Sequence, residues 1–496
     1  MQQYRKLAGQ TALYGLGTIV PRFLNYVVLT PFYTHIFSQE QYGIVTNLYA
    51  YVVFLLILLT YGLETGYFRF TKAEDDPRKV FSTIMASLFT TSLIFILLVL
   101  FFNHPLARVL DYPDRSYLIT LFSLVVAIDA FSAVPFAKLR FEQKAKKFGY
   151  LKIFNVLVNL FFNFVFFILL PYIQNHYPGS VLLNFYDPSI GVGYVFVSNL
   201  MASLLTLVLL LPEINVLPRL VDLKLLKQIF RYCLPLLVVG LAGTINEVAD
   251  KELIKRFVPD EASPMKQLGI YGANYKLGML MTIFIQMFRY AAEPFYFSKM
   301  KDFDAKETYA KVMRYFIIFG LFIFLLVTLY IDIFKYFIDD KFHSGLHIVP
   351  VILMANLFLG INYNLSIWYK LSNLTRFGAF IALIGAAITI TMNITLLPVY
   401  GYEASAWATF ACYAVMMIVS FFFGRKHYLI PYALKAIFFY FLVTLAIFFI
   451  QKFIHYPGVI QKNLFNSLFL LVFIGIVLKK ERIKISDIKA FIGINR

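Results

Sequence analysis

Two polar side chains, Arg22 and Asn25, share one helical face inside an apolar stretch of this sequence. An ionisable group at mid-membrane costs roughly 2.5 to 3.5 kcal/mol, so it normally faces a protein interior or a wet cavity. A guanidinium there can hold a phosphate through two parallel hydrogen bonds. We therefore expect Arg22 and Asn25 to contact an anionic substrate.

Arg289 is a second candidate cation, and it belongs to a polar stripe that runs from Asn274 to Tyr296. A guanidinium on a polar helix face within the membrane could contact an anionic substrate. Glu293 lies four residues later on the same face, however, so the two side chains could simply neutralise one another. Lys276, near the start of this stripe, is expected at a cavity rim or reaching toward the membrane surface.

Acidic and basic residues alternate after the apolar run 233–245: Glu247, Asp250, Lys251 and Glu252 follow it, with Arg256 one turn further on. One interpretation is a water-exposed helix end laced with ion pairs, Glu247 with Lys251 and Glu252 with Arg256. The other makes Lys251 a phosphate ligand equivalent to Arg22, with Glu247 and Asp250 as proton or cation sites.

Three further carboxylates fall within apolar segments: Glu64, Glu293 and Asp129. Glu64 and Glu293 could close a gate by pairing with Arg69 or Lys299, carry coupling protons, or form structural pairs. Asp129 is a candidate for ion coupling or for hydrogen bonding. We find no catalytic set and no metal-ligand spacing, since Cys233 and Cys412 lie singly in apolar runs.

The composition assigns these residues to a membrane protein. The chain has 496 residues, is 60% hydrophobic and only 15% charged, and has a mean hydropathy of +0.73. Most of its net charge of +18 lies in alternate loops and in the tail, which predicts cytoplasmic termini rather than nucleic-acid binding. Fourteen spans are predicted, at 9–36, 42–68, 80–102, 117–137, 148–171, 190–211, 232–257, 268–297, 312–334, 346–369, 377–397, 403–423, 430–451 and 463–478.

The sequence also contains an internal repeat at a constant offset of 229 residues. This offset aligns Tyr42-Gly43 with Tyr271-Gly272 and Glu64 with Glu293. Because six spans separate the copies, the two lobes should have the same orientation in the membrane. We expect an all-α membrane protein with two six-helix lobes, 1–218 and 219–425, followed by two helices and a basic tail in 426–496.

This repeat, the "QYGI" turn at 41–44 and "YGLETGYFRF" at 61–70 resemble the MATE-like (MOP) exporter superfamily. Within it, the chain is similar to the Wzx-type polysaccharide-unit flippases and to the MurJ-type lipid II flippases. The resemblance implies two lobes that rock between inward-open and outward-open states. It also implies a polyprenyl-diphosphate sugar as substrate, with a lipid-tail groove formed by the last two helices.

The expected function is therefore transport of a lipid-linked oligosaccharide from the cytoplasmic to the outer leaflet of a bacterial inner membrane, for surface polysaccharide synthesis. A lipid II flippase and a MATE-type exporter of cations are the alternatives. No cofactor is expected beyond possible Na⁺ or H⁺ coupling, because no Walker A loop is present. Expected partners are the lipid-linked sugar, membrane lipids and a polysaccharide polymerase or glycosyltransferase. An enzyme is not expected, because the outer loops are short.

Overall fold

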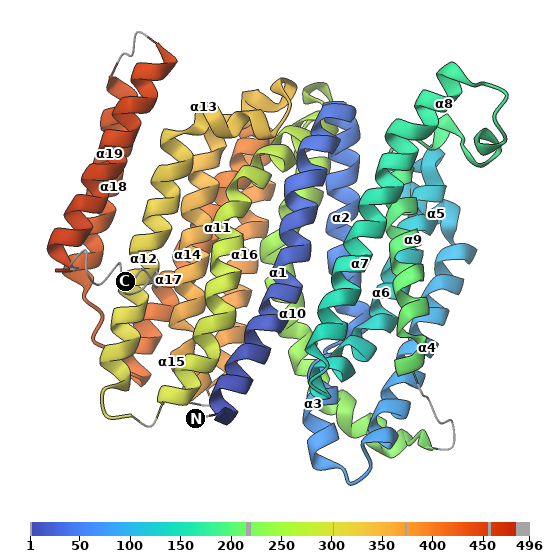
Figure 1. The fold of residues 1–496 in the computed structure, drawn as a ribbon, viewed down its shortest axis with the longest axis horizontal. Coiled ribbons are helices and arrows are strands. Elements are labelled where there is room, and N and C mark those ends of the chain that lie inside the picture. The colour runs from blue at the N-terminus through green and yellow to red at the C-terminus, as the bar shows by residue number, and fades with distance from the viewer. Residues whose placement is uncertain (1, 215–219, 301, 373, 455–457, 483–496) are drawn as a thin grey trace. The chain divides into compact units, whose positions relative to one another are not determined.

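The computed structural model describes residues 2–214, 220–300, 302–372, 374–454 and 458–482. Within these ranges the chain is helical, without strands, as predicted. Twelve described stretches are long and apolar enough to cross a membrane, so this is a multi-pass membrane protein. The main helices (Figure 1) are α1 (Gln2–Ile36), α2 (Gln39–Thr60), α3 (Leu63–Ala73), α4 (Pro77–Phe101), α5 (Asn103–Val109), α6 (Ser116–Phe141), α7 (Ala145–Phe164), α8 (Leu170–His176), α9 (Gly193–Leu210), α10 (Leu223–Phe257), α11 (Pro264–Lys299), α12 (Ala305–Leu329), α13 (Ile331–Phe334), α14 (Val349–Leu365), α15 (Ile367–Leu371), α16 (Arg376–Tyr400), α17 (Tyr402–His427), α18 (Leu434–Phe453) and α19 (Val459–Lys480).

The predicted number of fourteen spans exceeds these twelve. The two remaining predicted spans, 9–36 and 268–297, lie in the helices α1 and α11, which are not among the twelve apolar stretches. Fourteen spans therefore stay a prediction.

The helices pack as two compact units. Unit 1 comprises residues 1–273 and 376–412, and unit 2 comprises residues 274–375 and 413–496. Helices α11 and α17 each contribute residues to both units. The predicted lobes, 1–218 and 219–425, were defined by the sequence repeat, whereas the two units are defined by helix packing. The lobes therefore stay a prediction.

In unit 1, a break between α2 and α3 fixes the direction of Glu64. Ser38 and Gln41 cap the start of α2 reciprocally. The helix ends where Tyr61 and Gly62 adopt left-handed backbone angles, with φ of 33° and 77°. The predicted helix 42–68 is therefore two helices, because the chain turns at these two residues.

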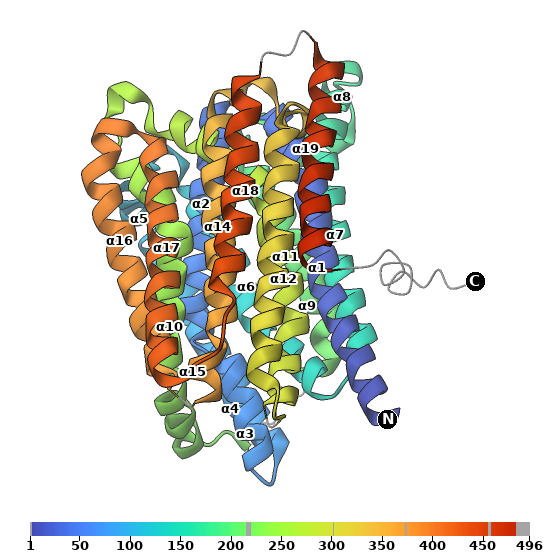
Figure 2. The same cartoon turned by 90° about the vertical axis from the view of Figure 1, so that its left-hand side faces the viewer.

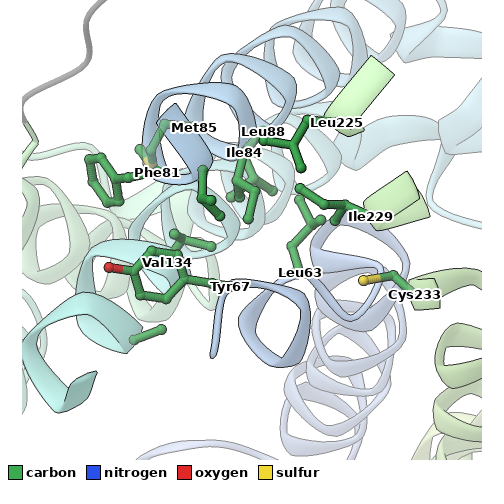
Figure 3. Close-up of a cluster of buried hydrophobic side chains, with 12 residues drawn as sticks. Leu63, Tyr67, Phe81, Ile84, Met85, Leu88, Val134, Leu225, Ile229 and Cys233 are labelled. Atoms are coloured by element: carbon green, nitrogen blue, oxygen red, sulfur yellow. The ribbon is translucent and has the colours of Figure 1, made fainter. Parts of the chain in front are cut away.

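Leu63 and Tyr67 of α3 enter an apolar cluster with side chains of α4, α6 and α10 (Figure 3). Ile229 and Cys233 of α10 belong to the same cluster. The face of α3 that carries Leu63 and Tyr67 is buried in this cluster, and Glu64, next to Leu63, is half-buried. Burial of the apolar face thus positions the carboxylate.

The last turns of α10 are tied to α2, also within unit 1. The Glu252 carboxylate accepts hydrogen bonds from Asn47 Nδ2 (3.0 Å), Tyr51 Oη and Arg256 Nε. The predicted Glu252–Arg256 pair is therefore confirmed. Arg256 also donates to the carbonyl oxygen of Val109, at 3.1 Å.

In unit 2, α12 is the central helix, and α14, α18 and α19 all pack against it (Figure 2). Arg314 of α12 pairs with Glu481, just beyond α19, at 3.0 Å. The same carboxylate accepts a hydrogen bond from Tyr440 of α18. Toward the opposite end, Lys462 of α19 pairs with Asp332 of α13 at 2.5 Å. These contacts fasten the final two helices to α12.

Candidate functional site

Arg289, Glu293 and Lys370 form a charged cluster in unit 2. Glu293 Oε1 accepts a hydrogen bond from Lys370 Nζ of α15 at 2.6 Å. The Arg289 guanidinium lies over the ring of Tyr363, 5.0 Å from its centroid, rather than against Glu293. Neither the neutralising pair Arg289–Glu293 nor the gate pair Glu293–Lys299 is therefore present, since Lys299 pairs with Asp302 at 2.6 Å.

The three charged side chains line a small cavity between α11 and α14–α15. Tyr296 and Asn364 line it too, and the Tyr296 hydroxyl donates to Asn364 Oδ1 at 2.6 Å. The cavity volume is about 20 Å³, which is room for one water molecule. A phosphate group needs more space than this, although the Arg289 side chain itself is exposed.

A matching ion pair occurs in unit 1, where Arg140 of α6 pairs with Glu64 of α3 at 2.5 Å. Each of the two carboxylates that the repeat aligns thus pairs with a cation 76 or 77 residues further along the chain. All four side chains keep between 32% and 43% of their surface exposed. Arg69, the predicted partner of Glu64, instead stacks on Tyr232 at 4.1 Å.

Lys152 lies near the Glu64–Arg140 pair and also near the predicted residues Asp129 and Arg22. Its ammonium lies 3.8 Å from the ring centroid of Phe136 and interacts electrostatically with Asp129, Glu64, Arg140 and Arg22. Asp129 accepts a hydrogen bond from Ser203 Oγ at 2.7 Å. These five groups, three cations and two carboxylates, have a formal net charge of +1.

Arg22 and Asn25 of α1 differ in their surroundings. Arg22 is exposed, whereas the Asn25 Oδ1 atom is buried and has no hydrogen-bond partner among the described residues. An unpaired buried amide oxygen is costly. A polar ligand or a water molecule could satisfy it, in keeping with the role predicted for this face of α1.

Lys251 forms an ion pair in this helix end, although its acidic partner is Asp250 rather than the predicted Glu247 side chain. Asp250 is only 3% exposed and accepts hydrogen bonds from Lys251 Nζ (2.9 Å) and Tyr271 Oη (2.5 Å). Lys251 Nζ also donates to the Glu247 carbonyl oxygen at 3.0 Å. The predicted roles of Lys251 as a phosphate ligand and of Asp250 as a proton or cation site stay predictions.

Two predicted residues lie apart from the clusters. The Glu247 side chain is exposed, and Lys276 is half-buried on α11, more than three turns before Arg289. Lys276 is not among the residues that line the unit 2 cavity. The unit 2 cluster therefore consists of Arg289, Lys370 and Glu293, and it also has a net charge of +1.

Comparisons with known proteins assign the family. Residues 7–301, more than half of the chain, match the family model described as polysaccharide biosynthesis protein. The chain belongs to this family. A search of curated protein sequences found no match to this chain.

Solved structures share the fold of this polysaccharide biosynthesis protein at low sequence identity. The lipid II flippase MurJ in an inward-closed conformation matches with a TM-score of 0.71 and 14% identity, over 95% of this chain and 99% of MurJ. An inward-facing multidrug-resistance MATE transporter of the MOP superfamily matches with a TM-score of 0.64 and 12% identity, over 84% and 94%. The MATE multidrug transporter DinF-BH matches with a TM-score of 0.62 and 14% identity, over 87% and 96%. The fold is thus MurJ- and MATE-like, as the sequence resemblance implied.

The sequence analysis did not identify three cations as candidate site residues: Arg140, Lys152 and Lys370. Each lies close to a predicted helix end, where topology or reach to the membrane surface explains a basic residue without any site. The carboxylates could have indicated these cations. Glu64, Glu293 and Asp129 lie in apolar segments, where each needs a nearby cation, and Arg140, Lys370 and Lys152 are such cations.

Proposed function

We propose that this protein is a flippase that moves a polyprenyl-diphosphate-linked oligosaccharide from the cytoplasmic to the outer leaflet of a bacterial cytoplasmic membrane. Family membership and the many apolar helices support this role. A charged sugar head group cannot cross about 30 Å of hydrocarbon unaided, because it would lose its hydration. The lipid tail can stay in the bilayer, so the protein needs to shelter only the head group.

The observation that carries the proposal is the pair of clusters with one excess positive charge each. In unit 1, three cations, Arg22, Arg140 and Lys152, accompany two carboxylates, Glu64 and Asp129. In unit 2, Arg289 and Lys370 accompany Glu293. A diphosphate offers the negative charge that both clusters lack. Phosphate oxygens accept charge-assisted hydrogen bonds from guanidinium and ammonium groups, as carboxylates do. The head group can therefore exchange with a carboxylate for the same cation.

Such an exchange is reversible because the resident ion pairs are weak. Partly exposed pairs contribute about 0 to 1 kcal/mol, so binding of a phosphate can separate them. The free volume beside the unit 2 cluster is smaller than a phosphate group, so the proposal requires these side chains to move apart when the head group binds. Alternating access supplies this change, provided that the substrate binds the two states with different affinities.

The energy source is proposed to be a proton or sodium gradient or the membrane potential. Moving one elementary charge through 100 mV supplies about 2.3 kcal/mol. Glu64, Glu293 and Asp129 are the carboxylates placed to couple an ion to binding, because each lies beside a cation of a cluster. Both termini are proposed to be cytoplasmic, and a polysaccharide polymerase or glycosyltransferase is the proposed protein partner.

A lipid II flippase is the second candidate. The match to MurJ extends over 95% of this chain, against 84% for the MATE transporter. Lipid II also carries a diphosphate, so the two clusters would serve it equally well. An exporter of lipophilic cations is disfavoured, because cavities that bind cations need an excess of carboxylates and both clusters have an excess of cations.

The test is a flipping assay with purified protein in liposomes that contain a fluorescent polyprenyl-diphosphate oligosaccharide. We expect Arg289→Gln and Arg140→Gln each to lower the transport rate at least tenfold, while Lys299→Gln, which removes an exposed cation outside the clusters, leaves it near wild type. Full transport by both cluster variants, or transport of lipophilic cations instead, would contradict the proposal.

A further inference from the structure

A second cavity lies in unit 2, between α15, the end of α17 and the segment that leads into α18. Its volume is about 210 Å³, and Trp368, Phe421, Arg425, Tyr428, Tyr432 and Leu434 are among the residues that line it. None of these residues belongs to the Arg289–Glu293–Lys370 cluster or lines the smaller cavity. The lining is largely aromatic and apolar, with one guanidinium.

The walls of this cavity are fixed by packing. Trp368 is 1% exposed, and its indole N–H donates to Ser420 Oγ at 3.3 Å. Gly424 allows α17 to approach Trp368, since a Cβ at this position would lie 2.8 Å from the Trp368 ring. On the other side, Ile430 is buried in an apolar cluster that includes Tyr296 and Tyr309. The cavity is therefore preformed.

Arg425 lines this cavity, and Lys426 is the next residue in the chain. Arg425 and Lys426 occupy the last turn of α17, are exposed, and form no ion pair with any residue that the structure describes. Lys306 of α12 lies 4.8 Å from the ring centroid of Tyr428, a cavity residue. A helix C-terminus favours cations in general. That preference does not account for an aromatic cavity next to them.

We propose that this cavity binds an anionic phospholipid from the leaflet at this end of α17, which is predicted to be the cytoplasmic one. The lipid phosphate contacts Arg425 and Lys426. The part of the acyl chain nearest the head group packs against Trp368, Phe421 and Tyr432. Basic pockets between membrane helices recognise anionic head groups in this way. The site joins α15 and the end of α17 to α18, so an occupied site stabilises that junction. This inference is independent of the transported substrate.

The experiment measures binding of phosphatidylglycerol and phosphatidylcholine, with identical acyl chains, to delipidated full-length protein by native mass spectrometry. We expect wild type to prefer phosphatidylglycerol. At about 1 kcal/mol for each charge, Arg425→Gln with Lys426→Gln should weaken phosphatidylglycerol binding roughly 30-fold. The charge-preserving variant Arg425→Lys with Lys426→Arg should retain the preference. Leu434→Trp, which fills the cavity, should reduce binding with every charge intact.

The matched control is Lys224→Gln with Lys227→Gln, which removes two exposed cations at the start of α10. It should bind phosphatidylglycerol as wild type does, and thermal unfolding confirms that each variant is folded. Equal binding of the two lipids, equal losses in the control and the Arg425–Lys426 variant, or no loss in the latter would overturn the proposal. Displacement of phosphatidylglycerol by lower concentrations of a polyprenyl diphosphate would also overturn it, by assigning the cavity to the transported lipid.

Discussion

At the scale of single residues, the candidate site consists of cations whose charge is only partly neutralised. Glu64 and Glu293 each hold one cation, and Arg289 rests on an aromatic ring rather than on a carboxylate. The two carboxylates and the phosphates of a substrate are therefore competitors for Arg140 and Lys370. Removing a carboxylate charge should favour the substrate.

Glu293→Gln tests this competition. The variant leaves Lys370 without its charged partner, so we expect the dissociation constant for a polyprenyl diphosphate to fall about threefold to tenfold. Transport should become slower, because release becomes harder. Titration of purified protein measures the first effect. Asp302→Asn, which releases Lys299 outside the cluster, is the control, and weaker binding by Glu293→Gln would refute the competition.

Asp250→Asn tests whether the Lys251 pair is structural. This buried carboxylate accepts bonds from Lys251 and Tyr271, and its loss removes the charged partner of a Lys251 side chain that is only 13% exposed. We expect destabilisation by roughly 3 to 5 kcal/mol, read as a lower thermal unfolding midpoint, with little change in substrate affinity among folded molecules. A stable variant that no longer binds substrate would support the predicted ligand role of Lys251.

At the scale of elements, the sequence predicted helices well and their interruptions poorly. Twelve of the fourteen predicted spans coincide with helical stretches long and apolar enough to cross a membrane, because hydropathy is the main signal for such stretches. The break at Tyr61-Gly62 was missed, since backbone angles depend on packing against α10 as well as on the glycine. The partners of Glu64 and Glu293 were missed for a similar reason: they come from other helices, and the hydrophobic pattern does not specify which helices meet.

The close crossing of α2 with the start of α11 gives a prediction at this scale. A Cβ on Gly43 would lie 2.0 Å from the Met265 carbonyl oxygen, and one on Gly269 would lie 1.8 Å from the Gln39 carbonyl oxygen. Gly43→Ala must therefore push the two helices apart, at a cost of about 1 to 3 kcal/mol in thermal unfolding. Gly243→Ala, with no heavy atom within 4 Å of the new Cβ, should be neutral or stabilising. Equal stability of both variants would argue against this tight crossing.

At the scale of the whole molecule, an all-helical membrane protein of the flippase class was predicted from the sequence, and the family match and the fold of the solved structures agree with it. The sequence repeat aligns Glu64 with Glu293, and the structure adds that each carboxylate pairs with a cation, Arg140 or Lys370, although the offset of 229 aligns Arg140 with Tyr369. The attachment of α18 and α19 was not predictable, because Arg314, Glu481 and Lys462 resemble ordinary helix-end charges in the sequence.

That attachment predicts a pH dependence. The hydrogen bond from Lys462 lowers the pKa of Asp332 below its usual value of 3.8, against the opposing effect of burial. A carboxyl group whose pKa is lower in the folded state stabilises that state above 3.8 and loses this contribution as the pH falls through its lowered pKa. Hydrogen exchange in α18 and α19 should therefore rise only in strong acid, whereas Asp332→Asn raises it at neutral pH. Slow exchange in this variant at neutral pH would show that the pair does not hold the helices.

The central claim is that the clusters around Arg289 and Arg140 bind a diphosphate head group. Its most direct test is the dissociation constant of purified protein for a polyprenyl diphosphate, compared for wild type, Arg289→Gln, Arg140→Gln and the Lys299→Gln control. We predict that each cluster variant binds at least tenfold more weakly and that the control binds as wild type does. Equal affinity in all four proteins would contradict the claim.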